Sequence, residues 1–223
     1  MKHLKIFKTQ AEFISETLEL PNVSFIEETK SVNFVPKKIS DPFNGHEYVD
    51  LGLPSGTLWA TCNIGAATPE EKGDCFNWGE TLPRTQSYED VCVTQGLSID
   101  ELKSRGIIGD SCNLTAEYDA ATVNWGGSWR MPTISEIQEL LDNCSWQLIY
   151  DPHILQKLVG PNGNFIIIPG TGIHDYDGNG YYWSSDVSGY DSQAYELFSS
   201  PIYKYTQSVP RIRETAIRPV IKI

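Results

Sequence analysis

The sequence predicts an α+β protein, in which a domain of short strands, long ordered loops and two or more helices follows a small N-terminal β-α-β-β module. Three observations support this fold class. Short apolar runs, such as Thr57 to Ala60 and Phe165 to Ile168, alternate with stretches rich in Gly, Pro, Asn and Trp. Helix-capping patterns occur between these runs, and turn-forming residues divide the chain near residue 40. Helices among many short strands favour α+β over a doubly wound sheet.

The N-terminal module is expected to contain a strand, a helix and a hairpin. Leu4 to Phe7 is a short apolar run, and Thr9 with Glu12 forms a capping-box pattern at the start of a helix. Residues 23–35 then alternate around a polar turn, as the two strands of a hairpin do. So small a unit buries little core of its own, and we expect it to dock on the main domain or on a partner.

The boundary between the two regions lies in residues 36–45, a stretch dense in turn-forming residues. We assign residues 1–40 to the module and residues 41–223 to the main domain. The chain carries 17 Lys and Arg against 29 Asp and Glu, a net charge of −12, which disfavours nucleic acid as a partner. It has neither an apolar run of membrane-spanning length nor a signal-peptide pattern, so no membrane partner is expected.

Helices of the main domain are expected in four places. Capping-box pairs open two of them, Ser98 with Glu101 and Thr133 with Glu136. The helix after Thr133 has one apolar face, formed by Ile134, Ile137, Leu140, Leu141 and Cys144. The other two candidates are Thr115 to Asn124, and Asp151 to Val159 with Gly160 as its C-cap.

Five blocks of the main domain occur in an order that we recognise. They are YVDLGLPSGTLWATCNIGA (48–66), GDCFNWGET (73–81), YDAATVNWGGSWRMPTISEIQELLDNC (118–144), GYYWSSD (180–186) and AIRPV (216–220). Together they resemble the major paralogous domain family of gut bacteria and their phages. That family is similar to the C-type-lectin-like superfamily, which also contains formylglycine-generating enzymes and the variable proteins of diversity-generating retroelements. The resemblance implies a C-type-lectin-like domain over residues 48–223.

Tryptophans beside glycines are expected to form the core of this domain, because a missing side chain leaves room for an indole between close backbones. They are Trp59, Trp78, Trp125, Trp129 and Trp183. Arg130, between Trp129 and Met131, is expected to pair with an acidic group in a scaffold role. Arg218 is given a similar scaffold role.

Catalysis is not expected from the residues that usually perform it. The formylglycine-generating enzymes use a cysteine pair near the C-terminus, whereas the last cysteine here is Cys144. Five cysteines without a CxxC pair predict reduced, buried thiols. The four histidines lie in no metal-ligand spacing and accompany no GxSxG serine.

A calcium site is the one cofactor that the sequence offers. Asp175, Asp177 and Asn179 precede a glycine with the spacing of a calcium loop, and Asp186 falls at its twelfth position. Against calcium, no helix is expected on either side and the twelfth residue is Asp instead of the bidentate Glu. A tight acidic turn explains the same segment, and we favour the turn.

The stretch from Tyr176 to Tyr205 holds seven of the eleven tyrosines, interleaved with Ser and Asp. Tyr, Ser, Gly and Asp are typical of adaptable binding surfaces. Because Gly189, Pro201 and Pro210 interrupt regular strand, we favour exposed loops over strands packed in the core. The resemblance places the variable residues of retroelement-diversified proteins here, at Asp186, Ser188, Tyr190, Asp191, Ser192, Tyr195, Tyr203, Tyr205, Arg211 and Arg213.

These observations lead to a hypothesis of a non-enzymatic receptor-binding protein of a phage virion, or a phage-derived one, with a diversified surface. Its expected ligand is a bacterial surface protein or glycan. Residues 1–40, which resemble modules on gut-phage structural proteins, would contact other virion proteins or form a homo-oligomer. The chain would then lie on the virion surface, or in the host cytoplasm before assembly. The alternatives are an assembly protein that makes only subunit contacts and a bacterial adhesin-like domain.

Overall fold

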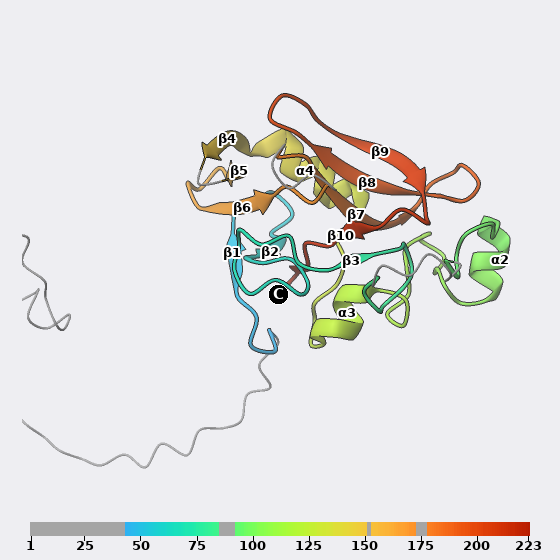
Figure 1. Ribbon diagram of the computed structural model, residues 1–223. Helices are drawn as coiled ribbons and strands as arrows, with labels where there is room; N and C mark the ends of the chain where they lie inside the picture. The colour runs from blue at the N-terminus through green and yellow to red at the C-terminus, as the bar shows by residue number, and fades with distance from the viewer. Residues whose placement is uncertain (1–42, 85–91, 151–152, 173–177) are drawn as a thin grey trace, which may run out of the picture. The chain divides into compact units, whose positions relative to one another are not determined.

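The computed structural model describes residues 43–84, 92–150, 153–172 and 178–223 (Figure 1). The chain divides into two units, Met1–Ile39 and Ser40–Ile223. The strands and helix expected within residues 1–40 lie outside the described residues. The second unit is a mixed α+β domain, as the sequence predicted. No helix among its described residues is long and apolar enough to cross a membrane.

The first sheet joins the two ends of the domain. Its strands, in spatial order, are β1 (Tyr48–Asp50), β2 (Leu58–Ala60) and β11 (Val220–Ile221). All pairs are antiparallel, and Trp59 lies opposite both Val49 and Val220. Arg218, just before β11, is buried and donates to the Asn63 side chain and to the carbonyls of Ala60, Thr61 and Ile167. This arginine therefore ties the end of the chain to the start of the domain.

The second sheet is the largest, and in Figure 1 it runs from the middle of the domain, at β3 and β10, to its upper edge, at β9. Its order is β3 (Cys75–Phe76), β10 (Thr215–Ala216), β7 (Gly180–Val187), β8 (Gln193–Ser199) and β9 (Lys204–Pro210). Only the β10–β7 pair is parallel. The third sheet is an antiparallel meander of β4 (Ser145–Tyr150), β5 (Ile154–Val159) and β6 (Phe165–Pro169).

Three helices occur among the described residues: α2 (Ile99–Ser104), α3 (Ala120–Trp125) and α4 (Ile134–Asn143). Both predicted capping boxes are confirmed, with Ser98 and Glu101 opening α2 and Thr133 and Glu136 opening α4. The helix predicted from Thr115 begins five residues later, because the Asp119 side chain accepts a hydrogen bond from Thr122 N and so acts as its N-cap.

The helix predicted over Asp151 to Val159 is wrong, because residues 154–159 form the central strand β5. Leu155 and Leu158 are buried and satisfy a strand as well as a helix, so the short apolar pattern does not discriminate between them. Pairing with β4 and β6 decides the outcome. Gly160 is not a helix cap; a Cβ there would collide with the Leu51 carbonyl.

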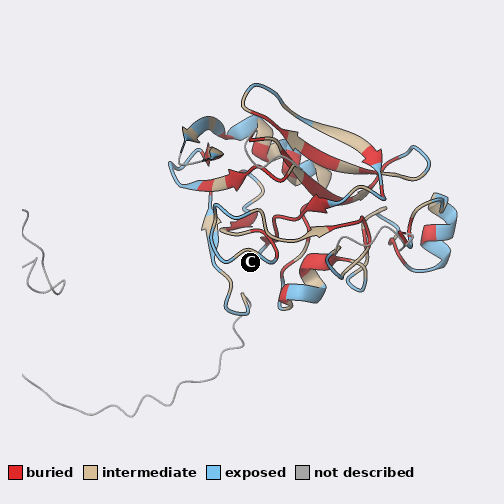
Figure 2. Cartoon of the chain, in the orientation of Figure 1, coloured by how far each residue is buried: buried red, intermediate tan, exposed pale blue. Residues whose placement is uncertain are grey.

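The core contains two clusters of buried side chains, and the predicted role of the tryptophans is confirmed. Trp59, Trp78, Trp125, Trp129 and Trp183 are all buried. Most of them belong to a cluster that includes β3 and α3, whereas Trp59 joins a second cluster with α4, β5 and β6. Helix α4 packs on β7, β8 and β9, and its Ile137 and Leu140 are buried. Figure 2 shows the helix beside the largely buried strands β7 and β8. The central strands are thus packed against core side chains on both faces of the sheet.

Candidate functional site

The Tyr-rich segment does not form the exposed loops that we predicted. Its described residues fold into the three strands β7, β8 and β9, joined by residues 188–192 and 200–203, whereas Tyr176 lies outside the described residues. The β7–β8 pairing shifts register between Trp183 and Val187. Gly189 and Pro201 lie in these connections, and Pro210 is the last residue of β9, so none of them interrupts a strand. Exposure is therefore confined to the two connections and to one end of the sheet.

The predicted ligand-binding residues separate into two groups. Tyr190, Asp191 and Ser192 lie in the β7–β8 connection, whereas Tyr203 and Tyr205 lie at the β8–β9 hairpin. Strand β8 separates the two connections, and its seven residues span about 20 Å at roughly 3.3 Å per residue. Tyr190 and Tyr203 are both well exposed, at 69% and 65%. One small ligand cannot contact both groups.

Several predicted contact residues turn out to be parts of the scaffold. Ser188 and Arg211 are fully buried. The Arg211 guanidinium donates to the carbonyls of Thr94 and Leu97 and lies 5.5 Å from the centre of the Trp78 ring. Both residues are unavailable to a ligand because their side chains are buried.

Three more predicted residues have structural contacts. Asp186 is half-buried and accepts a hydrogen bond from Ile134 N at the start of α4, at 2.7 Å. Ser192 Oγ accepts from Gly96 N. Tyr195 alternates in phase with buried Leu197, which places its side chain on the face of β8 that packs against α4. Of the ten predicted residues, a ligand can reach the exposed Tyr190, Asp191, Tyr203 and Tyr205, and the half-exposed Arg213.

A row of aromatic rings crosses the opposite face of the sheet. Tyr181, Phe198 and Tyr205 lie directly opposite one another on β7, β8 and β9. Adjacent ring centroids are 5.2 and 5.0 Å apart, with both pairs of rings tilted by 46°. Tyr205 is 46% exposed and the other two rings are partly exposed. We call Tyr181, Phe198 and Tyr205 the aromatic row.

Arg213 and Glu196 flank the aromatic row. The Arg213 guanidinium lies 4.1 Å from the centre of the Tyr181 ring and pairs with Glu196 at 3.1 Å. Glu196 is buried, and it also accepts hydrogen bonds from Gln207 at 2.7 Å and Thr215 at 3.3 Å. Burial raises the pKa of the Glu196 carboxyl, an effect that Arg213, Gln207 and Thr215 oppose. Arg213 itself is half-exposed, so this pair holds a cation at the rim of the row.

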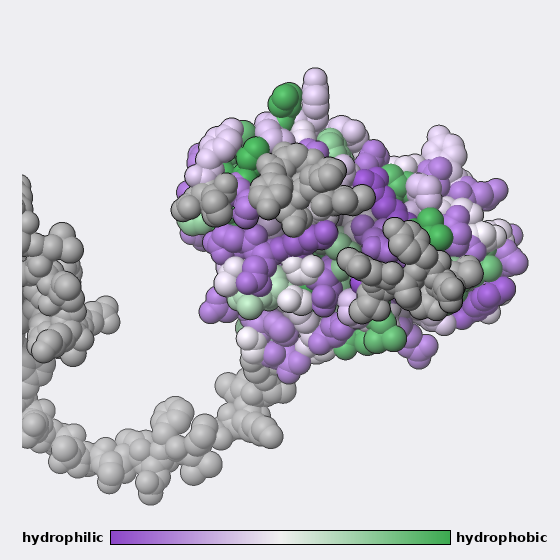
Figure 3. All heavy atoms as spheres, viewed as in Figure 1, coloured by the Kyte–Doolittle hydropathy of each residue, from purple (hydrophilic) through white to green (hydrophobic). Residues whose placement is uncertain are grey.

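Sequence reasoning missed Tyr181, Phe198 and Glu196 as parts of this site. Tyr181 was counted among the tyrosines of the segment and in a family block, whereas Phe198 and Glu196 were not singled out. Only the strand register, which no single sequence displays, brings them beside Tyr205. On the face shown in Figure 3, hydrophobic side chains are scattered among polar ones.

Asp186 cannot complete the calcium site that the sequence offered as an alternative. Asn179 and Asp186 lie at opposite ends of β7, whose eight residues extend over more than about 20 Å. Two ligands of one calcium ion each lie within about 2.6 Å of it, so these two residues cannot share an ion. Asp175 and Asp177 lie outside the described residues. Within the part of the chain that the structure describes, no three His, Cys, Asp or Glu residues are grouped as metal ligands.

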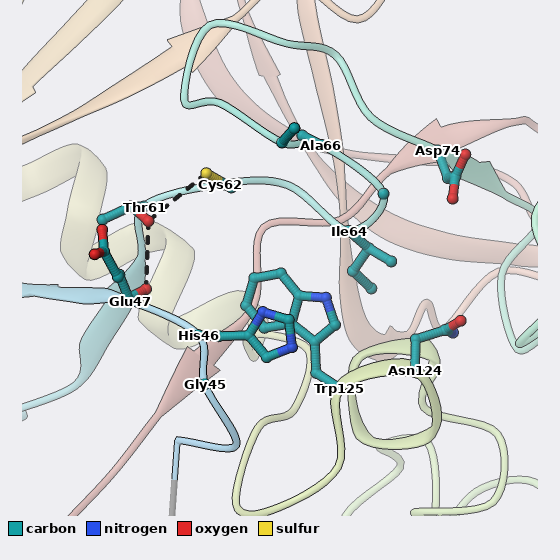
Figure 4. Close-up of a pocket in the computed structure, with 12 residues that line it drawn as sticks. Gly45, His46, Glu47, Thr61, Cys62, Ile64, Ala66, Asp74, Asn124 and Trp125 are labelled. Carbon is teal, nitrogen blue, oxygen red and sulfur yellow. Dashed lines mark hydrogen bonds between the residues drawn. The ribbon is translucent and has the colours of Figure 1, made fainter.

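A second candidate site is a pocket of about 620 Å³ beside α3 (Figure 4). The His46 ring stacks on the Trp125 ring, with centroids 3.7 Å apart and an angle of 5°, and lies at the centre of the view. Burial lowers the pKa of His46. Cys62 also lines the pocket, and its sulfur accepts a hydrogen bond from the Thr61 hydroxyl at 3.7 Å. No hydrogen bond described for Cys62 links it to His46, so the pocket offers no paired nucleophile and base.

Comparison with known proteins identifies no relative: no family model, curated protein or solved structure matches the chain.

Proposed function

We propose that the chain is a non-enzymatic binding protein whose ligand contacts the aromatic row, together with Arg213 and the adjoining Tyr203. The observation that carries this proposal is the row itself, three rings held in register on neighbouring strands with a cation at one end. Rings fixed on strands lose little conformational entropy when they bind. Tyr hydroxyls and the guanidinium supply hydrogen bonds around the apolar ring faces.

The expected ligand is a bacterial surface protein or a glycan. Both present apolar patches flanked by hydrogen-bond acceptors, which suit tyrosine faces and a half-exposed arginine. The chain's net charge of −12 makes a nucleic acid an unsuitable ligand. Because Arg213 is already paired with the Glu196 carboxylate, it suits hydrogen bonding to a ligand better than binding of a strongly anionic group.

Two features argue against an enzyme. Cys144, the cysteine nearest the C-terminus, is buried, and burial raises the pKa of its thiol to about 11. At neutral pH this thiol is protonated and a weak nucleophile. The pocket in Figure 4 holds a histidine and a cysteine without the hydrogen bond that would activate the sulfur.

The biological setting that we propose rests on the family resemblance of the five sequence blocks. It is a phage or phage-derived protein on the virion surface, with residues 1–40 as the attachment module and the β7–β9 region as a retroelement-diversified surface. The runner-up is an assembly protein, in which the aromatic row would contact another subunit. A bacterial adhesin-like domain is a third possibility with the same binding chemistry.

The test compares two exposed tyrosines at opposite ends of the sheet in the full-length chain. Tyr205→Ala and Arg213→Ala should each weaken binding to arrayed bacterial surface proteins and glycans by about 1–3 kcal/mol, whereas Tyr190→Ala should not. Loss of binding on Tyr190→Ala alone would move the site to the β7–β8 connection. If the wild-type chain binds virion proteins and no surface molecule, the assembly function replaces the receptor-binding one.

A further inference from the structure

The pocket beside α3 has a floor of stacked rings. The His46 ring lies flat on the Trp125 ring, with centroids 3.7 Å apart, and Trp125 in turn meets the Trp129 ring edge-on at 5.0 Å. Ile64 and Ala66 continue the apolar part of the lining. Because Trp125 and Trp129 are both buried, the packed core supports the His46 ring from behind. The middle of the pocket is therefore a firmly held, weakly polar surface.

The charged side chains that line this pocket are both carboxylates. They belong to Glu47 and Asp74, which lie on opposite sides of the stacked rings in Figure 4. Neither carboxylate has a hydrogen-bond or ion-pair partner among the described residues, and no Lys or Arg occurs in the described lining. Burial lowers the pKa of His46, so its imidazole is neutral at neutral pH and adds no positive charge. The pocket thus presents a negative charge on each side of an apolar middle.

Both carboxylates stand on backbone that hydrogen bonds hold in place. Asp74 N donates to the Ile64 carbonyl at 2.8 Å, which closes the loop between these two residues. A Cβ at Gly65, where φ is +78°, would collide with an Asp74 carboxylate oxygen, so this carboxylate lies directly against the glycine. On the other side, the Glu47 carbonyl accepts a hydrogen bond from Thr61 N at 3.1 Å. The two negative charges are therefore features of the fold.

We propose that this pocket binds a linear aliphatic diamine, with one ammonium group beside Glu47, the other beside Asp74 and the methylene chain across the rings. Such a ligand complements the pocket in charge at both ends and in polarity at its middle. Each ammonium group gains an ion pair with a carboxylate that has no described partner. The methylene groups leave water for contact with His46 and Ile64. The site shares no residue with the aromatic row, so this inference does not depend on the function proposed for that row.

Other cations fit the pocket less well. A metal ion needs several ligands within about 2.6 Å of one point, whereas these two carboxylates lie on opposite sides of the rings. Within the part of the chain that the structure describes, no three His, Cys, Asp or Glu residues are grouped as metal ligands. A monoamine would leave one carboxylate unpaired. The volume of about 620 Å³ is in the usual range for a small organic ligand, and an elongated dication uses both ends of it.

The test is isothermal titration calorimetry of the full-length chain with α,ω-diaminoalkanes of increasing length. Affinity should pass through a maximum at one chain length, because shorter diamines cannot reach both carboxylates and longer ones must bend. The α,ω-diol of that length keeps the chain without the charges and should not bind. The monoamine of that length should bind about two- to fivefold more weakly than the diamine. NMR signals of the Trp125 indole and the His46 imidazole should shift as the diamine is added.

Isosteric variants make the result specific to the two carboxylates. Glu47→Gln and Asp74→Asn should each weaken binding of the best diamine by about two- to fivefold and remove the preference for its length. Glu70→Gln makes the same charge change at an exposed residue outside the lining and should bind as the wild type does. Circular dichroism of each variant should match that of the wild type.

Three results would overturn the proposal. The first is the absence of binding by any diamine of the series. The second is equal weakening by all three variants, or an affinity that does not depend on chain length, since either would indicate diffuse attraction to a chain of net charge −12. The third is a loss confined to only one of Glu47→Gln and Asp74→Asn, because a single ammonium group would then be bound.

Discussion

Replacing Glu136 by Gln tests the polar network that holds α4 on the central sheet. Glu136 accepts two hydrogen bonds from the Arg130 guanidinium, at 2.6 and 2.7 Å, which confirms the acidic partner predicted for Arg130. It also accepts from Thr133 N at 2.9 Å, as the capping box requires, and from the Thr57 hydroxyl. An amide keeps the shape of the side chain but loses its charge and one acceptor oxygen.

The expected loss of stability follows from the pKa of Glu136. Burial raises this pKa, but Arg130 and the hydrogen bonds from Thr133 and Thr57 outweigh burial and lower it from 4.5 to about 2. Because one pKa unit corresponds to about 1.4 kcal/mol, the full shift would correspond to about 3 kcal/mol. Arg130 is about one-third exposed, so solvent screening reduces this value. We expect Glu136→Gln to lower the free energy of unfolding by about 2 kcal/mol at neutral pH.

The direction of the pKa shift determines how the loss of stability in Glu136→Gln should change with pH. A carboxyl whose pKa is lowered in the folded state contributes stability above its unfolded pKa of 4.5, and this stability is lost as the pH falls toward 2. The difference between wild type and Glu136→Gln should therefore shrink between pH 5 and pH 2. Urea unfolding at a series of pH values measures it. A difference below about 0.5 kcal/mol at neutral pH, or one that does not change with pH, would refute the reasoning.

Three further predictions separate core, surface and scaffold. Trp183→Ala should lower the free energy of unfolding by about 3–5 kcal/mol, because Trp183 is buried and its indole N–H donates to the Phe76 carbonyl. Tyr203→Ala should lower it by less than about 1 kcal/mol. Equal losses in thermal unfolding would contradict the assignment of Trp183 to the core and Tyr203 to the surface. Asp186→Ala should destabilise the domain by about 1 kcal/mol, because it removes the acceptor of the hydrogen bond from Ile134 N at the start of α4. Calcium should not change the unfolding temperature of the wild type. A calcium-dependent change that Asp186→Ala abolishes would restore the metal site. Cys144→Ser should leave any measured thiol-oxidase or hydrolase turnover unchanged, and a loss of turnover would revive the enzyme alternative.

Local signals in the sequence predicted local structure well. The capping boxes at Ser98 and Thr133 depend on residues three positions apart, so a single sequence contains all the information that they need. Burial of the tryptophans beside glycines was predictable for the same reason, since size and apolarity favour the core wherever the chain leads. Arg130 and its acidic partner Glu136 are also only six residues apart.

Features that depend on strand pairing could not be predicted in this way. Residues 154–159 satisfy both a helix and a buried strand, and their two strand neighbours decide the matter. The same holds for the Tyr-rich segment. Gly189, Pro201 and Pro210 indicated loops, yet the first two lie in the short connections between strands and Pro210 is the last residue of β9, while α4 packs on all three strands. Arg211 looked like a surface residue, and only the fold supplies the carbonyls that satisfy its buried guanidinium.

The position of the aromatic row on strands instead of loops affects how a ligand would be bound. Tyr181, Phe198 and Tyr205 are fixed by the same ladder that forms the sheet, and buried Glu196 holds Arg213 against Tyr181. Such a surface has little freedom to lose on binding, so its affinity depends on the identity of the exposed side chains more than on reorganisation of the backbone. Substitutions at exposed positions of the row should then change the ligand while leaving the fold intact. Buried Trp183 and Glu196, which lie opposite each other on β7 and β8, should tolerate few replacements, because Trp183 donates to the Phe76 carbonyl and Glu196 accepts from Gln207 and Thr215.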